Sequence, residues 1–206
     1  MDLSFFLQSL ITVFAVVDPL GGAMLFLAMT AGNTPAERRA MAKRAAWVSL
    51  GVLLVFLAGG RAVLSLFSIS LPAFQVAGGI VIGIMALDLL KATDTGVRAT
   101  QREEDEGLHK ADVSVTPIAV PMLAGPGAIS TVVVLSSVGG AEHAKLILAI
   151  DIALVAVTIY AMLAAADRIL DALGQTGVNV ITRLIGLIVL AVAVQFVLTG
   201  ISTFCK

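Results

Sequence analysis

The chain has 206 residues, of which 59% are hydrophobic and only 13% are charged. Because soluble domains carry about a quarter charged residues, this composition excludes an ordinary water-soluble globule and predicts a membrane protein. The formal net charge of −1 excludes a basic surface for nucleic acid, and the single cysteine excludes an internal disulfide.

Six segments are apolar over the length of about 20 residues that a helix needs to cross a bilayer. In chain order they are residues 3–31, 45–67, 71–90, 113–138, 146–166 and 180–204. We therefore predict an all-α polytopic membrane protein with six transmembrane helices in contact with the lipid bilayer.

Lys and Arg residues are distributed unevenly among the connections. Ten of the 13 lie in or directly beside the connections between spans one and two, three and four, and five and six. Because basic residues gather in cytoplasmic connections, both termini are predicted to face away from the cytoplasm. Thr34, Pro35 and Glu37 form the pattern of a capping box with proline at the first helical position, so the second helix should begin in the cytosol.

Two of the six spans contain sequences that interrupt a helix. Span one carries Asp18-Pro19-Leu20-Gly21-Gly22, and span four carries Pro117, Pro121 and Gly125-Pro126-Gly127. Proline removes a backbone donor, and unwound backbone at membrane depth persists only where protein or a watery cavity supplies hydrogen bonds. We predict that helices 1 and 4 are broken near the midplane.

A weak internal repeat relates the two interruptions. An offset of 107 residues aligns Asp18-Pro19-Leu20-Gly21 with Gly125-Pro126-Gly127-Ala128, Arg61 with Arg168, and Gly79 with Gly186. Each half holds three spans, so the second half would enter the membrane upside down, as in many secondary transporters. This 3+3 inverted repeat predicts a first repeat at residues 1–91, a cytoplasmic loop at 92–112 and a second repeat at 113–206.

The predicted binding site lies at the two breaks. A helix that resumes after a break points free N–H groups and its positive dipole end inward, which suits a carboxylate. Carbonyl groups before each break, with the Asp18 carboxylate, suit an ammonium group, a proton or Na⁺, so the ligand is predicted to be a small zwitterion. The predicted substrate-binding residues are Asp18, Pro19, Gly21, Gly22, Gly125, Pro126, Gly127, Ala128, Ser130 and Thr131.

Asp18 and Asp151 are the candidates for proton coupling. A carboxylate inside the membrane is costly and usually functional, yet an aspartate before proline is also a common N-cap, so both interpretations of Asp18 stay open. Asp151 lies six residues after Lys145, near the outer face, and is expected to pair there, to reach Arg61 or to join a relay. Neither site is expected to hold a metal.

Other polar or small residues in the spans have structural interpretations. Asp88 precedes Lys91 by three positions, which favours an interfacial pair. Gln195, in the middle of a span, is expected to hydrogen-bond to another helix. The GxxxG pattern from Gly79 to Gly83 is typical of close helix packing, and Ser130 and Thr131 either line the site or bond to their own helix.

The chain resembles the MarC family of integral membrane proteins over essentially its whole length. The motifs that carry the resemblance are Val17-Asp18-Pro19-Leu20-Gly21, Thr34-Pro35-Ala36-Glu37-Arg38 and the segment from Pro117 to Ile129. The resemblance implies a bacterial inner-membrane protein with periplasmic termini, in a family that includes a proton-driven transporter of small neutral amino acids such as glycine and alanine. Gly22 stands where many members carry asparagine, which leaves the specificity open.

Together these features predict a proton-coupled secondary transporter of small neutral amino acids that works by alternating access. An exporter of another small solute, such as a sugar, a metabolite or a drug, and a passive channel or scaffold are the alternatives. An enzyme and a cofactor are not expected, because paired cysteines, a membrane histidine and a second carboxylate equal to Asp18 are all missing from the spans. The coupling ion, the direction of transport and a homo-oligomeric state stay open.

Overall fold

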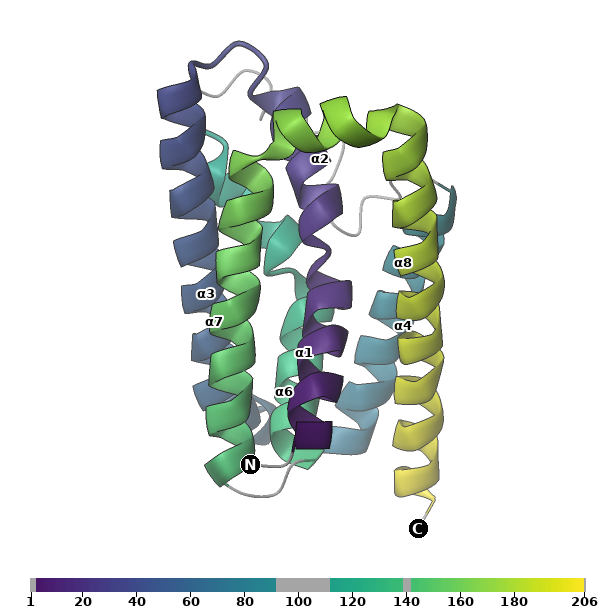
Figure 1. Ribbon diagram of the computed structural model, residues 1–206. Coiled ribbons are helices and arrows are strands. Elements are labelled where there is room, and N and C mark those ends of the chain that lie inside the picture. The colour runs from purple at the N-terminus through teal and green to yellow at the C-terminus, as the bar shows by residue number, and fades with distance from the viewer. Residues whose placement is uncertain (1–2, 92–111, 139–141, 206) are drawn as a thin grey trace.

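The computed structural model of the chain describes residues 3–91, 112–138 and 142–205. Within these ranges every regular element is a helix, and the helices gather into one bundle (Figure 1). The elements, labelled as in Figure 1, are α1 (Leu3–Val17), α2 (Pro19–Met29), α3 (Pro35–Leu66), α4 (Leu71–Lys91), η1 (Ser114–Leu123), α6 (Pro126–Val138), α7 (Glu142–Ala164) and α8 (Ala166–Phe204). The start of α1 and the end of α8 lie at the same end of the bundle.

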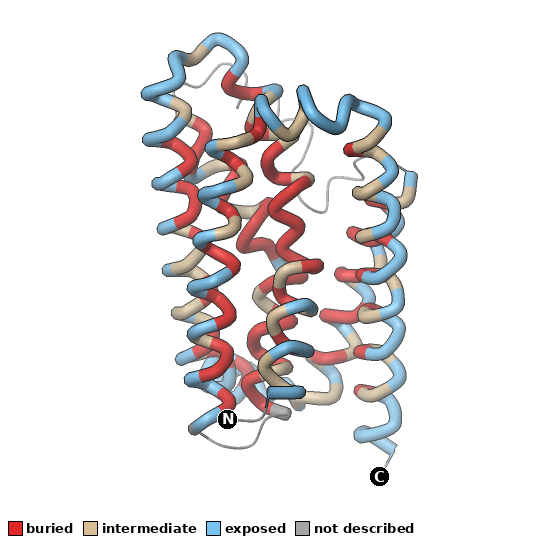
Figure 2. The backbone as a smooth tube through the Cα atoms, in the orientation of Figure 1, coloured by how far each residue is buried: buried red, intermediate tan, exposed pale blue. Residues whose placement is uncertain are grey.

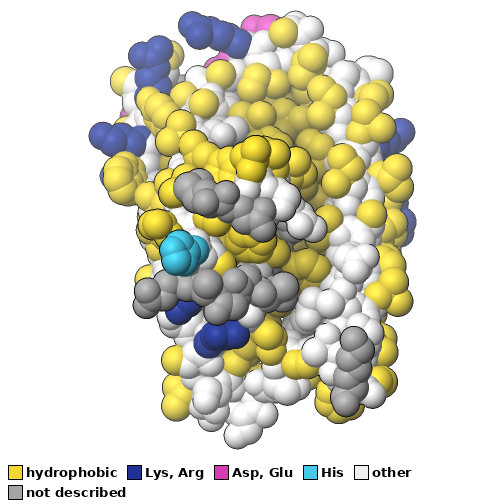
Figure 3. All heavy atoms as spheres, turned by 60° about the horizontal axis from the view of Figure 1, so that its bottom comes forward, with side chains coloured by type: hydrophobic (Ala, Val, Ile, Leu, Met, Phe, Trp, Pro, Cys, Tyr) yellow, Lys and Arg dark blue, Asp and Glu magenta, His cyan; other side chains and the backbone are white. Residues whose placement is uncertain are grey.

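Among the described residues, five helices are long and apolar enough to cross a membrane, or six when η1 and α6 form one bent span. Along these helices the buried positions face the interior of the bundle and the exposed positions face outward (Figure 2). Many outward-facing side chains are large and apolar, including Val157, Leu184 and Leu187. Hydrophobic side chains also cover much of the face seen in Figure 3. A surface of this kind suits lipid, and the prediction of an all-helical, multi-pass membrane protein is confirmed.

The first span is interrupted at one residue. Helix α1 ends at Val17 and α2 begins at Pro19, with Asp18 between them in the left-handed region at φ 49° and ψ 69°. Aspartate is one of the few residues other than glycine that adopt this conformation readily. Figure 1 places the junction about half-way along the bundle, with α1 and α2 each covering half its height.

The fourth span is interrupted more severely. Segment η1 is an irregular, wide helical stretch in which Thr116 and Val120, each followed by a proline, have extended backbone angles. Residues Ala124 and Gly125 separate it from α6, and the two pieces are bent by 52°. The residue before a proline is pushed away from helical angles, which explains why both extended residues stand where they do.

Helix α3 begins as the sequence predicts. The Thr34 hydroxyl accepts a hydrogen bond from the Glu37 N–H at 3.3 Å, and the Thr34 N–H donates to Glu37 Oε2 at 2.8 Å. This reciprocal pair is the capping box, and Pro35 takes the first helical position. Hydrogen bonds from the Thr34 backbone and side chain lower the pKa of the Glu37 carboxyl.

The connection between the fifth and sixth spans differs from the prediction. The sequence predicts a polar connection at residues 167–179, but these residues are helical and belong to α8 (Ala166–Phe204). Helix α8 is kinked at Gly174, where φ is +64°. In Figure 1 the first turns of α8 cross the end of the bundle before the helix turns along it. Glycine accommodates this positive φ without the steric cost that a side chain would bring.

Helices α4 and α8 form the most extensive helix pair, and glycines allow it. A Cβ atom placed on Gly79 would lie 2.9 Å from the Ala193 carbonyl oxygen and 3.1 Å from Phe196 Cβ. One placed on Gly186 would lie 3.2 Å from the Ala86 carbonyl oxygen and 2.8 Å from Leu89 Cβ. The prediction that Gly79 serves close helix packing is therefore confirmed.

Candidate functional site

The two interrupted spans touch each other beside their breaks. Gly22 lies in the first turn of α2, and a Cβ atom placed on it would lie 2.7 Å from Leu123 Cδ2 at the end of η1. Leu123 is fully buried and stands two residues before Gly125. The first turn of α2 and the end of η1, just before Gly125, therefore lie next to each other.

Asp18 caps α2. Its carboxylate oxygen Oδ1 accepts a hydrogen bond from the Gly21 N–H at 3.2 Å, and the side chain is buried. The Asp18 N–H donates to the Phe14 carbonyl at 3.0 Å, so the main chain of α1 stays bonded up to the break. Pro19 has no N–H to give to the turn before it, which leaves a carbonyl group of α1 without its helical donor. The capping interpretation of Asp18 is confirmed, and its role toward a ligand stays a prediction.

The other predicted binding residues surround these breaks with different exposures. Pro126 is exposed, although Gly125 and Gly127 on either side of it are buried, and Gly21 is half-buried. The break before α6 is therefore reachable from the surface of the molecule at Pro126. The remaining predicted residues are buried, namely Pro19, Gly22, Ala128, Ser130 and Thr131.

Part of the space beside the glycines is filled by the protein's own side chains. A Cβ atom on Gly127 would lie 2.7 Å from Met85 Sδ of α4, and one on Gly78 would lie 2.7 Å from Ser130 Cβ. Thr131 Oγ1 donates to the Gly127 carbonyl at 2.9 Å. This is a bond within its own helix, one of the two alternatives that the sequence left open for Thr131. Gly127 and Ser130 thus serve the contact between α6 and α4.

Asp151 is fully buried in α7 and meets Ser9 of α1. Ser9 Oγ lies 2.5 Å from Asp151 Oδ2 and also 2.7 Å from the Phe5 carbonyl oxygen. The Ser9 hydroxyl donates to Asp151 Oδ2 and so joins α1 to α7, and the Phe5 carbonyl oxygen lies close enough to share the same hydrogen. Asp151 Oδ1 has no hydrogen-bond partner in the described part of the chain.

The contact between Asp151 and Arg61, one of the alternatives considered for Asp151, does not form between these two described residues. Arg61 Nε donates instead to Ser137 Oγ at 3.0 Å, and its terminal nitrogen donates to the Ser137 carbonyl at 3.2 Å. Ser9 is the functional candidate that sequence reasoning missed. A serine in an apolar helix usually bonds to its own helix, and nothing local indicates a partner 142 residues away.

Gln195 and Asp88 also occupy informative positions. Gln195 is exposed on α8 and donates to Thr199 Oγ1 of the same helix at 3.0 Å, and among the described residues the expected bond to another helix is not found. Asp88 is buried in α4.

Charged residues near the start of α3 connect elements that are distant in sequence. Arg38 donates to both carboxylate oxygens of Asp167 at 2.9 Å, which joins the starts of α3 and α8. Arg44 pairs with Asp112, which in turn accepts a hydrogen bond from the Ser114 N–H at 2.9 Å. Partial burial raises the pKa of Asp112, but hydrogen bonds from Ser114 and the nearby Arg44 outweigh it and lower the pKa overall. In the described ranges, no three His, Cys, Asp or Glu residues are grouped to hold a metal ion.

Comparison with known proteins identifies relatives along the whole chain. A family model described as MarC family integral membrane protein matches residues 3–205. The UPF0056 membrane protein YvbG of Bacillus subtilis is 41% identical over 204 residues, which covers 98% of this chain and 96% of that protein. MJ1677 of Methanocaldococcus jannaschii is 33% identical, covering 98% of each chain, and YhcE of Escherichia coli is 32% identical, covering 98% of this chain and 94% of that protein. No solved structure matches.

Proposed function

The chain belongs to the MarC family of integral membrane proteins, and we propose that it is a secondary transporter of small neutral amino acids. The observation that carries the proposal is the contact between Gly22 and Leu123, which brings the start of α2 next to the interrupted fourth span. Interrupted helices that meet inside a bundle supply free backbone groups where a continuous helix has none.

The chemistry of these ends fits a zwitterion of glycine or alanine size. The first turns of α2 and α6 carry N–H groups without helical partners and positive dipole ends, which attract a carboxylate. Carbonyl groups freed by Pro19 and Pro126, together with the buried Asp18 carboxylate, attract an ammonium group. The close packing of Leu123 and Met85 against glycines leaves little space, so a small side chain fits better than a bulky one.

An inverted repeat of three plus three spans is part of the proposal, and the glycine contacts support it. Under the offset of 107 residues, Gly79 becomes Gly186, while the partners of Gly186, Ala86 and Leu89, become Ala193 and Phe196. These last two are the partners of Gly79, so exchanging the halves exchanges the two sets of contacts. The same offset relates the prolines that begin α2 and α6, and the first residues of α3 and α7. Two halves of this kind rock against each other in alternating access.

Proton coupling is assigned to Asp151 more readily than to Asp18. Asp18 is engaged as the cap of α2, where its carboxylate accepts from the Gly21 N–H. Asp151 lies inside α7, where backbone N–H groups are already bonded; the Ser9 hydroxyl meets its Oδ2, and its Oδ1 has no hydrogen-bond partner in the described part of the chain and is available for a proton. A movement of α1 against α7 would break this contact and expose the proton to one side. We also propose that both termini lie on the periplasmic side of a bacterial inner membrane.

Uptake of labelled glycine or alanine into proteoliposomes tests the function. We expect saturable uptake that increases when a proton gradient is imposed. Uptake without saturation would indicate a channel, and saturable transport of a sugar or drug but of neither amino acid would indicate the exporter of another solute. Absence of saturable uptake for a panel of small neutral amino acids would refute the proposal.

Two substitutions separate coupling from binding. Asp151→Asn should abolish uptake driven by the proton gradient but preserve exchange of amino acid across the membrane, because exchange needs no net proton movement. Asp18→Asn preserves the cap, since asparagine also accepts from Gly21 N–H, and removes only the charge. Asp171→Asn, on the exposed start of α8, is the matched control. If the Asp18 variant transports and binds normally, Asp18 is a cap only.

A further inference from the structure

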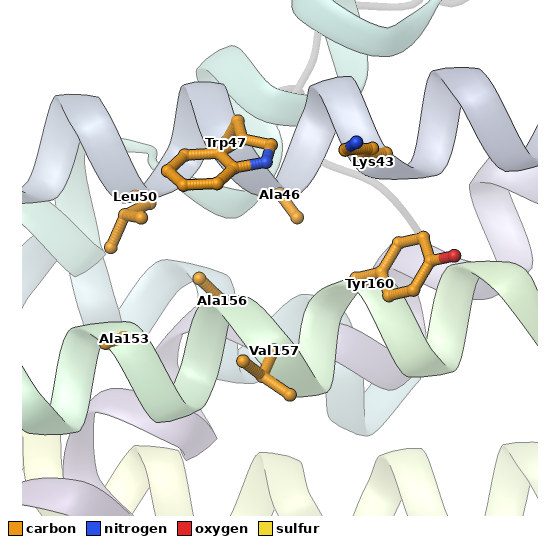
Figure 4. Close-up of a pocket in the computed structure, with 8 residues that line it drawn as sticks. All are labelled: Lys43, Ala46, Trp47, Leu50, Ala153, Ala156, Val157 and Tyr160. Atoms are coloured by element: carbon orange, nitrogen blue, oxygen red, sulfur yellow. The ribbon is translucent and has the colours of Figure 1, made fainter.

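A groove opens on the outer surface of the bundle between α3 and α7. Its volume is about 480 Å³, within the range of about 300–1,000 Å³ that small-molecule sites occupy. Figure 4 shows its lining side chains, which come from two turns of each helix. They are Lys43, Ala46, Trp47, Leu50, Ala153, Ala156, Val157 and Tyr160.

Small side chains make this surface hollow. Ala46 of α3 and Ala156 of α7 extend toward the space between the two helices, and Ala153 lies farther along α7 below Leu50, so small side chains line much of the α7 side of the groove (Figure 4). Trp47 and Tyr160 also line the groove and are 63% and 41% exposed, so both aromatic rings are accessible from the lipid side. Because α3 and α7 are both candidate membrane helices, this groove faces lipid.

One end of the groove is polar and basic. Lys43 and Tyr160 lie at the end nearer the start of α3, and the Tyr160 hydroxyl points toward that end (Figure 4). Arg39 is exposed one turn before Lys43 on the same face of α3. The neighbouring Arg38 and Arg44 pair with carboxylates, whereas Lys43 and Arg39 have no acidic partner in the described part of the chain. Two uncompensated positive charges therefore stand above an apolar groove.

We propose that this groove binds one anionic phospholipid. The phosphate lies against Lys43 and Arg39, the Tyr160 hydroxyl donates to the phosphate or ester oxygens, and an acyl chain follows the groove past Trp47 and Leu50. The apolar lining suits an acyl chain and offers nothing to free phosphate. Basic residues beside membrane helices select anionic headgroups, and aromatic rings gather at the level of those headgroups. The lipid would hold α3 against α7 near the start of α3, where Arg38 pairs with Asp167 and Arg44 with Asp112.

The single tryptophan of the chain reports on this groove directly. Trp47 is the only tryptophan, so quenching of its fluorescence by brominated acyl chains measures which lipids occupy its surroundings. The purified protein is reconstituted in vesicles that contain brominated phosphatidylglycerol, or brominated phosphatidylcholine with the same chains, at equal low fractions in unbrominated phosphatidylcholine. We expect stronger quenching by phosphatidylglycerol. Equal quenching by the two lipids would overturn the proposal.

Variants identify the charges responsible. Lys43→Gln and Arg39→Gln should each reduce the preference for phosphatidylglycerol, by about fivefold per charge removed. Lys145→Gln removes the same charge from the start of α7, at the other end of the bundle, and should leave the preference unchanged. An equal loss in this control would reduce the effect to overall charge and overturn the site.

A third variant tests the groove itself. Ala153 is exposed, so Ala153→Leu fills the groove without disturbing the core, which circular dichroism verifies. We expect phosphatidylglycerol to quench Trp47 in this variant no more than phosphatidylcholine does. A preference that survives the filled groove would show that the lipid binds elsewhere.

Discussion

The contact between α4 and α8 provides the sharpest test of the packing, through Gly186→Ala. A Cβ atom at this position would lie 2.8 Å from Leu89 Cβ and 3.2 Å from both the Ala86 carbonyl oxygen and the Leu90 nitrogen. Two of these three atoms belong to backbone that cannot rotate away, so the helices would have to separate. Overpacking of this kind costs about 1–3 kcal/mol in free energy of unfolding.

The expected magnitude follows from comparison with a glycine that contacts nothing. Alanine is more favourable than glycine inside a helix by about 1 kcal/mol, so Gly51→Ala, with no atom within 4 Å of the new Cβ, should stabilise the protein. Gly186→Ala gains the same helix propensity, but its new Cβ atom would overlap the atoms of α4 named above. The two variants should therefore differ by about 1–3 kcal/mol, with Gly186→Ala the less stable.

Unfolding by dodecyl sulfate in mixed micelles, followed by circular dichroism, measures this difference. Gly79→Ala should be destabilised like Gly186→Ala, because the new Cβ would meet the Ala193 carbonyl oxygen at 2.9 Å. Gly83→Ala lies in the same interface, but its Cβ would be 3.7 Å from Ala193 Cβ, an ordinary contact, and it should be tolerated. Equal stability of Gly186→Ala and Gly51→Ala would refute the close approach of α4 and α8.

Four further outcomes are expected at the ends of the helices. Thr34→Ala should cost about 1 kcal/mol and speed hydrogen exchange in the first turn of α3. Folding lowers the pKa of the Glu37 carboxyl from its ordinary 4.5. The stability that this carboxylate adds to the cap is therefore present above pH 4.5 and is lost as the pH falls through the lower folded pKa. Protection of this turn against hydrogen exchange should decline on acidification. Arg38→Ala should destabilise the protein by at most about 1 kcal/mol at low salt and less at high salt, in an unfolding titration, because Asp167 is largely exposed. Cys205 is exposed at the end of α8 and should react with a membrane-impermeant maleimide added to spheroplasts; labelling only after lysis would reverse the proposed orientation.

Local signals in the sequence were sufficient for most helix boundaries. The capping box of Thr34 and Glu37 involves residues three positions apart, so it could be predicted and is confirmed. The first turns of α8 could not be found by asking only for apolar length, because Asp167, Arg168 and Asp171 make them polar. A helical period would have indicated them, since Ile169 and Leu170 are partly buried between these exposed charges.

Contacts between distant residues lay beyond the sequence. Small residues in membrane helices serve both ligands and helix packing, and only the structure shows that Gly22 and Gly127 are approached by Leu123 and Met85. The partner of Asp151 could not be predicted either, because Ser9 lies on another helix and resembles any serine that bonds to its own turn.

The proposed coupling role of Asp151 makes a prediction for infrared spectroscopy at neutral pH. Asp18 caps α2 by accepting from the Gly21 N–H, so it is not assigned the transported proton. Asp151 is fully buried, its Oδ1 has no hydrogen-bond partner in the described part of the chain and its Oδ2 meets the Ser9 hydroxyl at 2.5 Å, so a proton carried through the bundle would reside on this carboxyl group. We expect a carbonyl band of a protonated carboxyl group that shifts in D₂O, disappears in Asp151→Asn and persists in Asp18→Asn. Ser9→Ala should keep the band but move it, because the carboxyl group then loses its hydrogen-bond partner. Survival of an unchanged band in Asp151→Asn would show that the proton resides on another group, and Asp151 would then have no claim to the coupling role.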